Sequence, residues 1–177
     1  KGLLTLGGRP LVTWSLQRLV SQVGEVVVSA NRNHADYQKL GARVISDSIS
    51  GYAGPLAGLF AGMQEVSSDW ILSAPCDSPL LASDYAERMY SAVKSGDLEA
   101  AVAHDGKRLQ PVFLLLSRRS QSSLGRFLAN DGRKIDLWLE EVPHQRVDFS
   151  DRSEMFLNVN TPEDLEEMES RIAGNNP

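Results

Sequence analysis

The chain has 177 residues, of which 42% are hydrophobic and 23% charged, values that are ordinary for one soluble globular domain with a substantial core. Its formal net charge of −5 argues against a protein that binds nucleic acid through an excess of Lys and Arg, and no apolar run approaches the roughly 20 residues that span a bilayer. The single cysteine, Cys76, excludes an internal disulfide, and a lone cysteine without a signal peptide is typical of a cytoplasmic protein.

The first half of the chain alternates helix-like and strand-like segments. Pro10 suits the first turn of a helix, and apolar residues then recur at mostly helical spacing until Gly24. The run over 25–30 is too apolar for a half-exposed strand and predicts a buried parallel strand. The elements expected next are a short helix over 36–40, a strand over 43–46, a loop from 47 to 55, a helix over 56–66 and a strand over 70–74.

The second half continues this alternation and adds a hairpin. Ser83 or Asp84 is expected to cap a helix that runs to about residue 93, and Asp105-Gly106 is a hairpin signal. Thr161, Pro162 and two acidic residues predict the start of a final helix. The other expected elements are strands over 99–103 and 112–116, helices over 120–129 and 134–140, and strands over 144–149 and 155–159.

Strands that alternate with helices predict a three-layer α/β fold, in which a mostly parallel sheet carries helices on both faces. We expect a single domain over residues 1–177. Ligands bind such sheets beyond the carboxyl ends of the strands. The residues that follow each expected strand are therefore the candidates for a binding site.

Asp77 is the leading candidate among these residues. It comes just after the strand expected over 70–74, and Pro75 and Pro79 stiffen the turn on both sides of it. Mg²⁺ usually takes one or two carboxylates together with phosphate oxygens and waters, so Asp77 is a candidate metal ligand. The alternative is a turn aspartate that accepts hydrogen bonds from its own backbone.

Polar groups also follow the other strands of the first half. Ser29 and Asn31 come after the first strand and can donate and accept hydrogen bonds at the edge of a ligand. Asp47 follows the second strand and could accept from a guanine edge or from ribose hydroxyls. Gly54-Pro55-Leu56 opens a helix, and a helix N-terminus attracts anions. An ordinary turn or loop-to-helix junction is the alternative for each of them.

The last third offers candidates for contact with a second substrate. Asn158 and Asn160 flank Val159 at strand spacing, so their amides are expected to share one face. Arg133 follows the turn Asp131-Gly132 and could reach an anionic second substrate. The alternatives are a solvated basic pair for Arg133 and a turn residue for Asn160.

Eight segments, taken in order, resemble the molybdenum cofactor guanylyltransferase family, which belongs to the NTP-transferase group. The segments are Lys1-Gly2-Leu3-Leu4, Gly8-Arg9-Pro10-Leu11, Ser29-Ala30-Asn31-Arg32, Asp47, Gly54-Pro55-Leu56-Ala57-Gly58, Cys76-Asp77-Ser78-Pro79, His104-Asp105-Gly106 and Asn158-Val159-Asn160-Thr161-Pro162. This resemblance spans nearly the whole chain and implies a Rossmann-like nucleotidyltransferase fold. In the family, a strand and a glycine-rich loop precede the lysine that matches Lys1, so we expect such a segment to precede Lys1.

The resemblance implies a magnesium-dependent enzyme that transfers GMP from GTP to molybdopterin, yielding the guanine dinucleotide cofactor and pyrophosphate. Asp77 would bind Mg²⁺ and Lys1 would neutralise phosphate charge, and both would serve catalysis. The residues implied to bind GTP are Lys1, Ser29, Asn31, Asp47, Gly54, Pro55, Leu56 and Asp77. Those implied to contact the pterin substrate are Asn158, Asn160 and Arg133. Transient contact with molybdoenzymes or cofactor-handling proteins is also implied.

Two other functions stay open at this stage. One is a related nucleotidyltransferase that uses CTP or a sugar-phosphate acceptor. The other is a non-catalytic nucleotide-binding module. Joining two phosphates requires alignment and charge neutralisation with little covalent work by the protein, so the enzyme hypothesis needs no nucleophile–base pair in the sequence.

Overall fold

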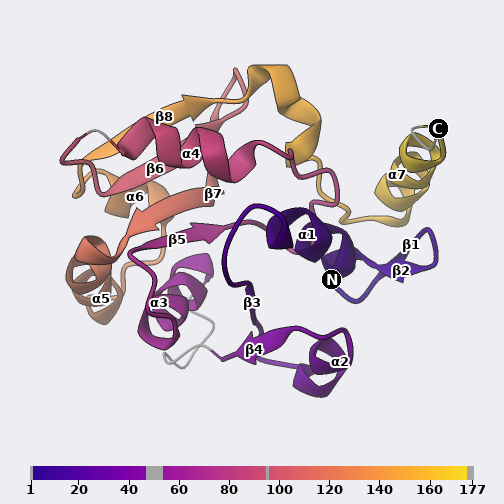
Figure 1. The fold of residues 1–177 in the computed structure, drawn as a ribbon, viewed down its shortest axis with the longest axis horizontal. Helices are drawn as coiled ribbons and strands as arrows, with labels where there is room; N and C mark the ends of the chain where they lie inside the picture. The colour runs from indigo at the N-terminus through magenta and orange to yellow at the C-terminus, as the bar shows by residue number, and fades with distance from the viewer. Residues whose placement is uncertain (1, 47–53, 95, 175–177) are drawn as a thin grey trace.

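The computed structural model describes residues 2–46, 54–94 and 96–174, and Figure 1 shows how their helices and strands are arranged. The strands are β1 (Thr5–Leu6), β2 (Arg9–Pro10), β3 (Val27–Ser29), β4 (Arg43–Ile45), β5 (Trp70–Ser73), β6 (Ala100–His104), β7 (Leu109–Ser117) and β8 (His144–Asp148). The α-helices are α1 (Leu11–Val20), α2 (His34–Lys39), α3 (Pro55–Glu65), α4 (Tyr85–Val93), α5 (Gln121–Ala129), α6 (Ile135–Leu139) and α7 (Pro162–Gly174), and the 3₁₀ helices are η1 (Arg118–Ser120) and η2 (Ser150–Phe156). Among the described residues, no helix is both long and apolar enough to cross a membrane.

Among the described residues the strands pair in three groups. β1 and β2 form a hairpin, β3 and β4 pair in parallel, and β5, β7, β6 and β8 form the largest sheet in that order. In the largest sheet β7 is antiparallel to both neighbours while β6 and β8 are parallel, so β5, β6 and β8 share one direction. The α/β architecture is confirmed, with β7 as the strand that makes the sheet mixed.

β7 is antiparallel to β6 because a tight turn joins the two strands. The backbone N–H groups of Lys107 and Arg108 donate to Asp105 Oδ1 over 2.8 and 2.7 Å, and Gly106 has φ +90°. These hydrogen bonds lower the pKa of Asp105 to about 2, with the backbone N–H of Arg108 as the largest cause. The hairpin expected from Asp105-Gly106 is therefore confirmed.

The largest sheet carries a hydrophobic core on each face, and alternate residues of β6 belong to different cores. Ala100 and Val102 pack with residues of α3, α5 and α6, whereas Ala101 and Ala103 pack with residues of α4 and η2. In Figure 1, α4 lies on one side of this sheet and α3 and α5 lie on the other. The expected arrangement of helices on both faces is confirmed.

A third, smaller core lies at the edge of the molecule where the hairpin, α1 and α7 meet. It contains Leu6, Leu11, Val159 and Met168, each at most 3% exposed. This core holds the segment before α7 against the N-terminal part of the chain. In Figure 1, α7 and the β1–β2 hairpin lie side by side at the right of the view.

The start of α7 follows the expected capping pattern. The backbone N–H of Asp164 donates to Thr161 Oγ1 over 3.1 Å, and Asp164 Oδ2 accepts from the N–H groups of Asn160 and Thr161 over 2.9 Å each. These reciprocal bonds form a capping box that satisfies the first free N–H groups of the helix. They also fix the backbone at Asn160.

Two features differ from the sequence-based expectation. The strand expected over 155–159 is wrong: η2 extends to Phe156, and Met155 and Phe156 both pack into the core around α4, which a helical turn permits and an alternating strand does not. The β1–β2 hairpin was not expected, although its turn residues Gly7 and Gly8 have φ +55° and +76° and form a two-residue hairpin signal. Most other expected elements are confirmed with ends shifted by a few residues.

Candidate functional site

The carboxyl end of β3 presents the first group of candidate residues. Ser29 and Asn31 are exposed there and line a hollow between β3 and β5. The backbone N–H of Ala30 donates to the carbonyl oxygen of Ile45 over 2.9 Å, which extends the pairing of β3 with β4. His34 Nε2 lies 2.6 Å from the Ala30 carbonyl oxygen, so the imidazole donates to it and folds the 30–34 segment back over the strand end.

The start of α3 lines the same hollow. Gly54 is the N-cap residue, with φ 74° and ψ −169°, and Pro55 occupies the first turn. This backbone conformation is nearly restricted to glycine, so the residue type is dictated by the way the chain enters the helix. Leu56 is fully buried in the core below, and therefore its backbone, rather than its side chain, is available to a ligand.

Asp77 lies in the turn that follows β5, and this turn is held on one side by α1. Ser15 Oγ lies 3.3 Å from the Pro75 carbonyl oxygen and 3.1 Å from that of Ser78, and donates to them from the buried face of α1. Asp77 is half-buried. A carboxylate on a braced turn beyond a strand end has the position that was expected for a ligand-binding residue.

The segment before α7 is joined to the same turn. The backbone N–H of Val159 donates to the Asp77 carbonyl oxygen over 3.1 Å, and Ser78 Oγ donates to Asn158 Oδ1 over 2.6 Å. Residues that are far apart in the sequence thus meet at one place. The structure brings Asp77 together with Asn158, and Val159 anchors the stretch between the two asparagines in the third core.

Arg133 lies elsewhere. Its guanidinium donates to the Leu128 and Gly132 carbonyl oxygens over 3.0 and 2.8 Å and to Asp131 Oδ1 over 3.0 Å. The Arg133 backbone lies next to Gly54, since a Cβ built on that glycine would be 4.0 Å from the Arg133 carbonyl oxygen. In Figure 1 the region between α5 and α6 is on the opposite side of the molecule from α7. Arg133 is therefore not grouped with the asparagines.

Two further candidates, Lys1 and Asp47, lie outside the described residues. Among residues 2–46, 54–94 and 96–174, no group of three or more His, Cys, Asp or Glu side chains is arranged to hold a metal ion. The described part of the site thus offers one carboxylate at the turn after β5, that of Asp77.

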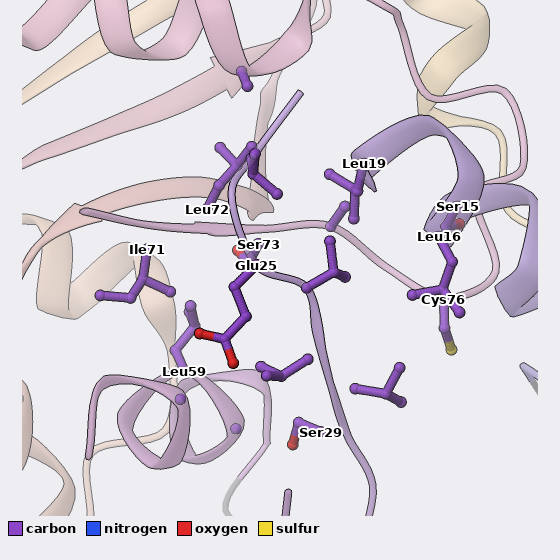
Figure 2. A pocket seen from close by; sticks show the side chains of 18 of the residues that line it. Ser15, Leu16, Leu19, Glu25, Ser29, Leu59, Ile71, Leu72, Ser73 and Cys76 are labelled. Carbon is purple, nitrogen blue, oxygen red and sulfur yellow. The ribbon is translucent and has the colours of Figure 1, made fainter. Parts of the chain in front are cut away.

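The hollow between β3 and β5 has a volume of about 990 Å³. Figure 2 shows leucines of three elements around it, namely Leu16 and Leu19 of α1, Leu59 of α3 and Leu72 of β5, with Ser29 and Cys76 near its borders. The hollow is therefore a groove with largely apolar walls that extends between the two strands. Its polar lining includes the residues at the strand ends.

Cys76, which precedes Asp77, and Tyr37, which lies near Cys76, stay neutral. Burial, followed by the nearby Asp77 carboxylate, raises the pKa of the Cys76 thiol, and burial followed by Cys76 raises the pKa of the Tyr37 hydroxyl. A thiol with a raised pKa is a poor nucleophile at neutral pH. The negative charge of this turn therefore comes from Asp77, and Cys76 is not suited to covalent catalysis.

The structure shows two contacts that sequence reasoning missed. Ser78 was part of a motif but had no assigned role, although it contacts Asn158, and His34 had none, although it fixes the end of β3. A serine next to the candidate aspartate was the available signal for Ser78. No spacing rule links a residue after β5 to one before α7, because their contact depends on the tertiary fold.

Known proteins are similar to this chain in sequence and in fold. The sequence profile of the MobA-like NTP transferase domain matches residues 1–145. Molybdenum cofactor guanylyltransferase of Shewanella piezotolerans (strain WP3 / JCM 13877) is 42% identical over 173 residues, covering 98% of this chain and 85% of that protein. The protein of the same name from Shewanella woodyi (strain ATCC 51908 / MS32) is 44% identical over 173 residues, covering 98% and 88%.

Solved structures agree on the fold. Molybdopterin-guanine dinucleotide biosynthesis protein A from Archaeoglobus fulgidus superposes with a TM-score of 0.81 at 22% identity, covering 98% of this chain and 91% of that one. CMP:2-keto-3-deoxy-manno-octonic acid synthetase, solved with CTP, gives a TM-score of 0.75 at 14% identity, covering 99% and 92%. These similarities show that the chain has the Rossmann-like nucleotidyltransferase fold.

We expect Gly54→Ala to destabilise the folded protein by about 1–3 kcal/mol, because alanine is strained at the φ and ψ of this N-cap. Urea unfolding measures the change. Gly24→Ala is the matched control, since Gly24 lies outside the left-handed region and a Cβ there meets nothing within 4 Å. Its effect should stay within about 0.5 kcal/mol. Equal losses of stability in the two variants would contradict the assigned conformational role.

Proposed function

The chain belongs to the MobA-like NTP transferase family of nucleotidyltransferases, and on this premise we propose that it transfers GMP from GTP to molybdopterin, forming the guanine dinucleotide cofactor and pyrophosphate. The observation that carries the proposal is the identity of 42–44% over 98% of the chain to proteins named for this activity. The contact between the Asp77 turn and the segment that contains Asn158 supports this proposal, because the reaction needs its two substrates side by side.

The reaction brings two anions together. An oxygen of the molybdopterin phosphate attacks the α-phosphorus of GTP, the bond from that phosphorus to the oxygen bridging to the β-phosphate breaks, and pyrophosphate leaves with that oxygen. The protein must therefore align the two phosphates and neutralise their charge. Such a reaction requires no protein nucleophile, in agreement with the neutral Cys76 thiol.

We assign GTP binding to the ends of β3 and β4 and to the start of α3. Ser29 and Asn31 would contact the nucleoside, as would Asp47, and the backbone at Gly54-Pro55-Leu56 would face polar groups of GTP. The α3 N-terminus favours nearby negative charge, which suits a triphosphate. Lys1 would neutralise phosphate charge in this proposal.

The acceptor is assigned to the segment before α7. Asn158 and Asn160 would bind molybdopterin with hydrogen bonds from their amides. Their support is the contact of this segment with the Asp77 turn, which would bring the acceptor to the nucleotide phosphates. The resemblance implied that Arg133 contacts the pterin substrate, but its backbone neighbours Gly54, so we propose it on the nucleotide side instead.

Mg²⁺ fits the residues present at the turn after β5. Asp77 offers a single half-buried carboxylate, and Mg²⁺ is commonly held by one or two carboxylates completed by phosphate oxygens and waters. We therefore propose that Asp77 holds Mg²⁺. When bound, the ion would lower the charge repulsion between the two phosphates.

The apolar groove between β3 and β5 supports a proposal about the rest of the domain. β3 pairs with β4 and β5 with β7, so within the described residues each borders the groove as the edge of its sheet. A central strand of a sheet lies between two strand edges and among apolar side chains, and the edges of β3 and β5 with the leucines around them offer this environment. We propose that a further strand of this protein, followed by a glycine-rich loop, lies in the groove and joins the two sheets. The curated relatives contain residues beyond the matched region, which covers 85–88% of their length, so a strand of this kind is compatible with their length.

We further propose that the reaction takes place in the cytoplasm, where GTP is available. The product must then reach an enzyme that uses it. Transient contact with a molybdoenzyme or a cofactor-handling protein is part of the same proposal. The single free cysteine is compatible with a reducing compartment.

The proposed activity is tested with protein expressed from the complete gene, incubated with GTP, Mg²⁺ and molybdopterin. We expect the dinucleotide and pyrophosphate in equal amounts, with turnover at least about tenfold faster for GTP than for CTP, because a base site discriminates by paired hydrogen bonds. Chromatography with mass detection measures both products. Nucleotide binding without product would favour the non-catalytic module, and equal use of CTP would contradict guanine recognition.

Asp77→Asn is expected to slow transfer by about 100-fold or more and to raise the Mg²⁺ concentration needed for half-maximal rate, because the amide carries no charge for the ion. Asp69→Asn is the matched control, since Asp69 is an exposed residue just before the same strand. It should leave the rate unchanged. Near-normal turnover of Asp77→Asn at ordinary Mg²⁺ concentrations would show that Asp77 is a turn residue.

The strand proposal predicts a difference between the complete gene product and the chain of residues 1–177. Amides of β3 and β5 should exchange more slowly with deuterium in the complete product, and its melting temperature should be higher by about 5–10 °C, because a central strand satisfies both edges and buries the leucines. Hydrogen exchange with mass detection and calorimetry test this. Identical exchange and melting of the two proteins would rule the strand out.

A further inference from the structure

A chain of hydrogen bonds crosses the site through Ser78. The carbonyl oxygen of Ser78 accepts from Ser15 Oγ of α1 over 3.1 Å, and its hydroxyl donates to Asn158 Oδ1 over 2.6 Å. Ser78 is 1% exposed and Ser15 is 4% exposed, so the bond between them is buried, while the bond from Ser78 to the exposed Asn158 is partly buried. Buried polar groups in such a network hold fixed orientations, because a lost partner is costly to replace.

The Ser78 hydroxyl donates to the oxygen of the Asn158 amide, and a flipped amide would leave this buried hydroxyl proton without that acceptor. Because Oδ1 is held by Ser78, the Nδ2 amide group is at the other end of the side chain. Asn158 is exposed, while the adjacent Val159 is anchored in the third core and its N–H bonds to the Asp77 carbonyl oxygen. The backbone is thus fixed as well, and the bond to Ser78 restrains the side-chain torsions that remain.

The orientation of this amide matters for an anionic acceptor. With Nδ2 outward, Asn158 offers two N–H donors to a phosphate or to a pterin carbonyl oxygen. With Oδ1 outward, it would present a negative dipole end to the same group and repel an anion. One buried hydroxyl therefore separates an attractive contact from a repulsive one.

We propose that Ser78 is a positioning residue for the acceptor: its hydroxyl locks the Asn158 amide so that the N–H donors face the phosphate-bearing substrate. This role rests on the proposed function, because it requires an anionic acceptor beside Asp77. Ser78 acts through Asn158 and has no direct contact with GTP in this scheme. The segment Cys76-Asp77-Ser78-Pro79 carries the aspartate proposed to hold Mg²⁺, and through Ser78 it also orients the amide proposed to bind the acceptor.

The test uses initial rates of the complete gene product at varied molybdopterin and varied GTP. Ser78→Ala should raise the KM for molybdopterin about fivefold to tenfold, the effect of one hydrogen bond, and leave the KM for GTP within about twofold. Ser78→Thr keeps the hydroxyl and should recover most of the loss. In an Asn158→Ala background, Ser78→Ala should add no further increase, because the group that it orients is already gone.

Ser120→Ala is the matched control for a buried serine. Ser120 is fully buried and its hydroxyl donates to the Ser117 carbonyl oxygen over 2.7 Å, at the start of α5. We expect a loss of stability similar to that of Ser78→Ala, with both KM values unchanged. This separates general destabilisation from positioning.

The outcomes distinguish the two levels of the proposal. If the unaltered protein forms no dinucleotide, the proposed function fails and this role of Ser78 fails with it. If the unaltered protein is active but Ser78→Ala leaves the KM for molybdopterin unchanged, or raises both KM values equally, only the positioning role is overturned. The same holds if the effects of Ser78→Ala and Asn158→Ala simply multiply. If Ser78→Ala does not fold, Ser78→Thr still decides, since loss of acceptor affinity in a folded Ser78→Thr contradicts the role of the hydroxyl.

Discussion

The hydrogen bond from the Val159 N–H to the Asp77 carbonyl oxygen is the contact on which the site depends. It joins the turn after β5 to the segment before α7, and it does so between backbone groups, so it is insensitive to most side-chain changes. A buried valine on one side and a serine of α1 on the other keep both partners in place. In the proposed reaction the two substrates lie at these two segments, so a constant separation between the segments would keep the substrates aligned.

The electrostatics of the site depend on local groups rather than on the net charge of the whole chain. The chain has a net charge of −5, yet its proposed substrates are anions. Backbone N–H groups at the start of α3 provide a positive dipole end without adding formal charge, and in our proposal the Asn158 amide does the same before α7. The raised pKa of the Cys76 thiol and of the Tyr37 hydroxyl prevents them from adding negative charge beside Asp77. The acidic surface of the molecule is therefore compatible with anion binding at one rim.

Sequence reasoning worked where a signal is local and failed where it depends on tertiary contact. The cap at Thr161 and the turn at Asp105-Gly106 are set by neighbouring residues, and both are confirmed. The strand expected over 155–159 is wrong because packing around α4 rewards a helical turn there. The position of Asp77 beyond β5 follows from fold class alone, whereas its contact with the 158–160 segment and the location of Arg133 next to Gly54 follow from the path of the whole chain.

The small third core has a consequence for how acceptor specificity can change. Val159 packs there with residues of the β1–β2 hairpin, α1 and α7, and the core is distinct from the two that cover the large sheet. The segment that carries Asn158 and Asn160 is thus held by this small core as well as by the turn after β5. Substitutions at the hairpin or along α7 would change the packing around Val159 while the two cores of the large sheet keep theirs. If these asparagines bind the acceptor as we propose, the preference for the second substrate can change through this small core while the nucleotide side keeps its packing.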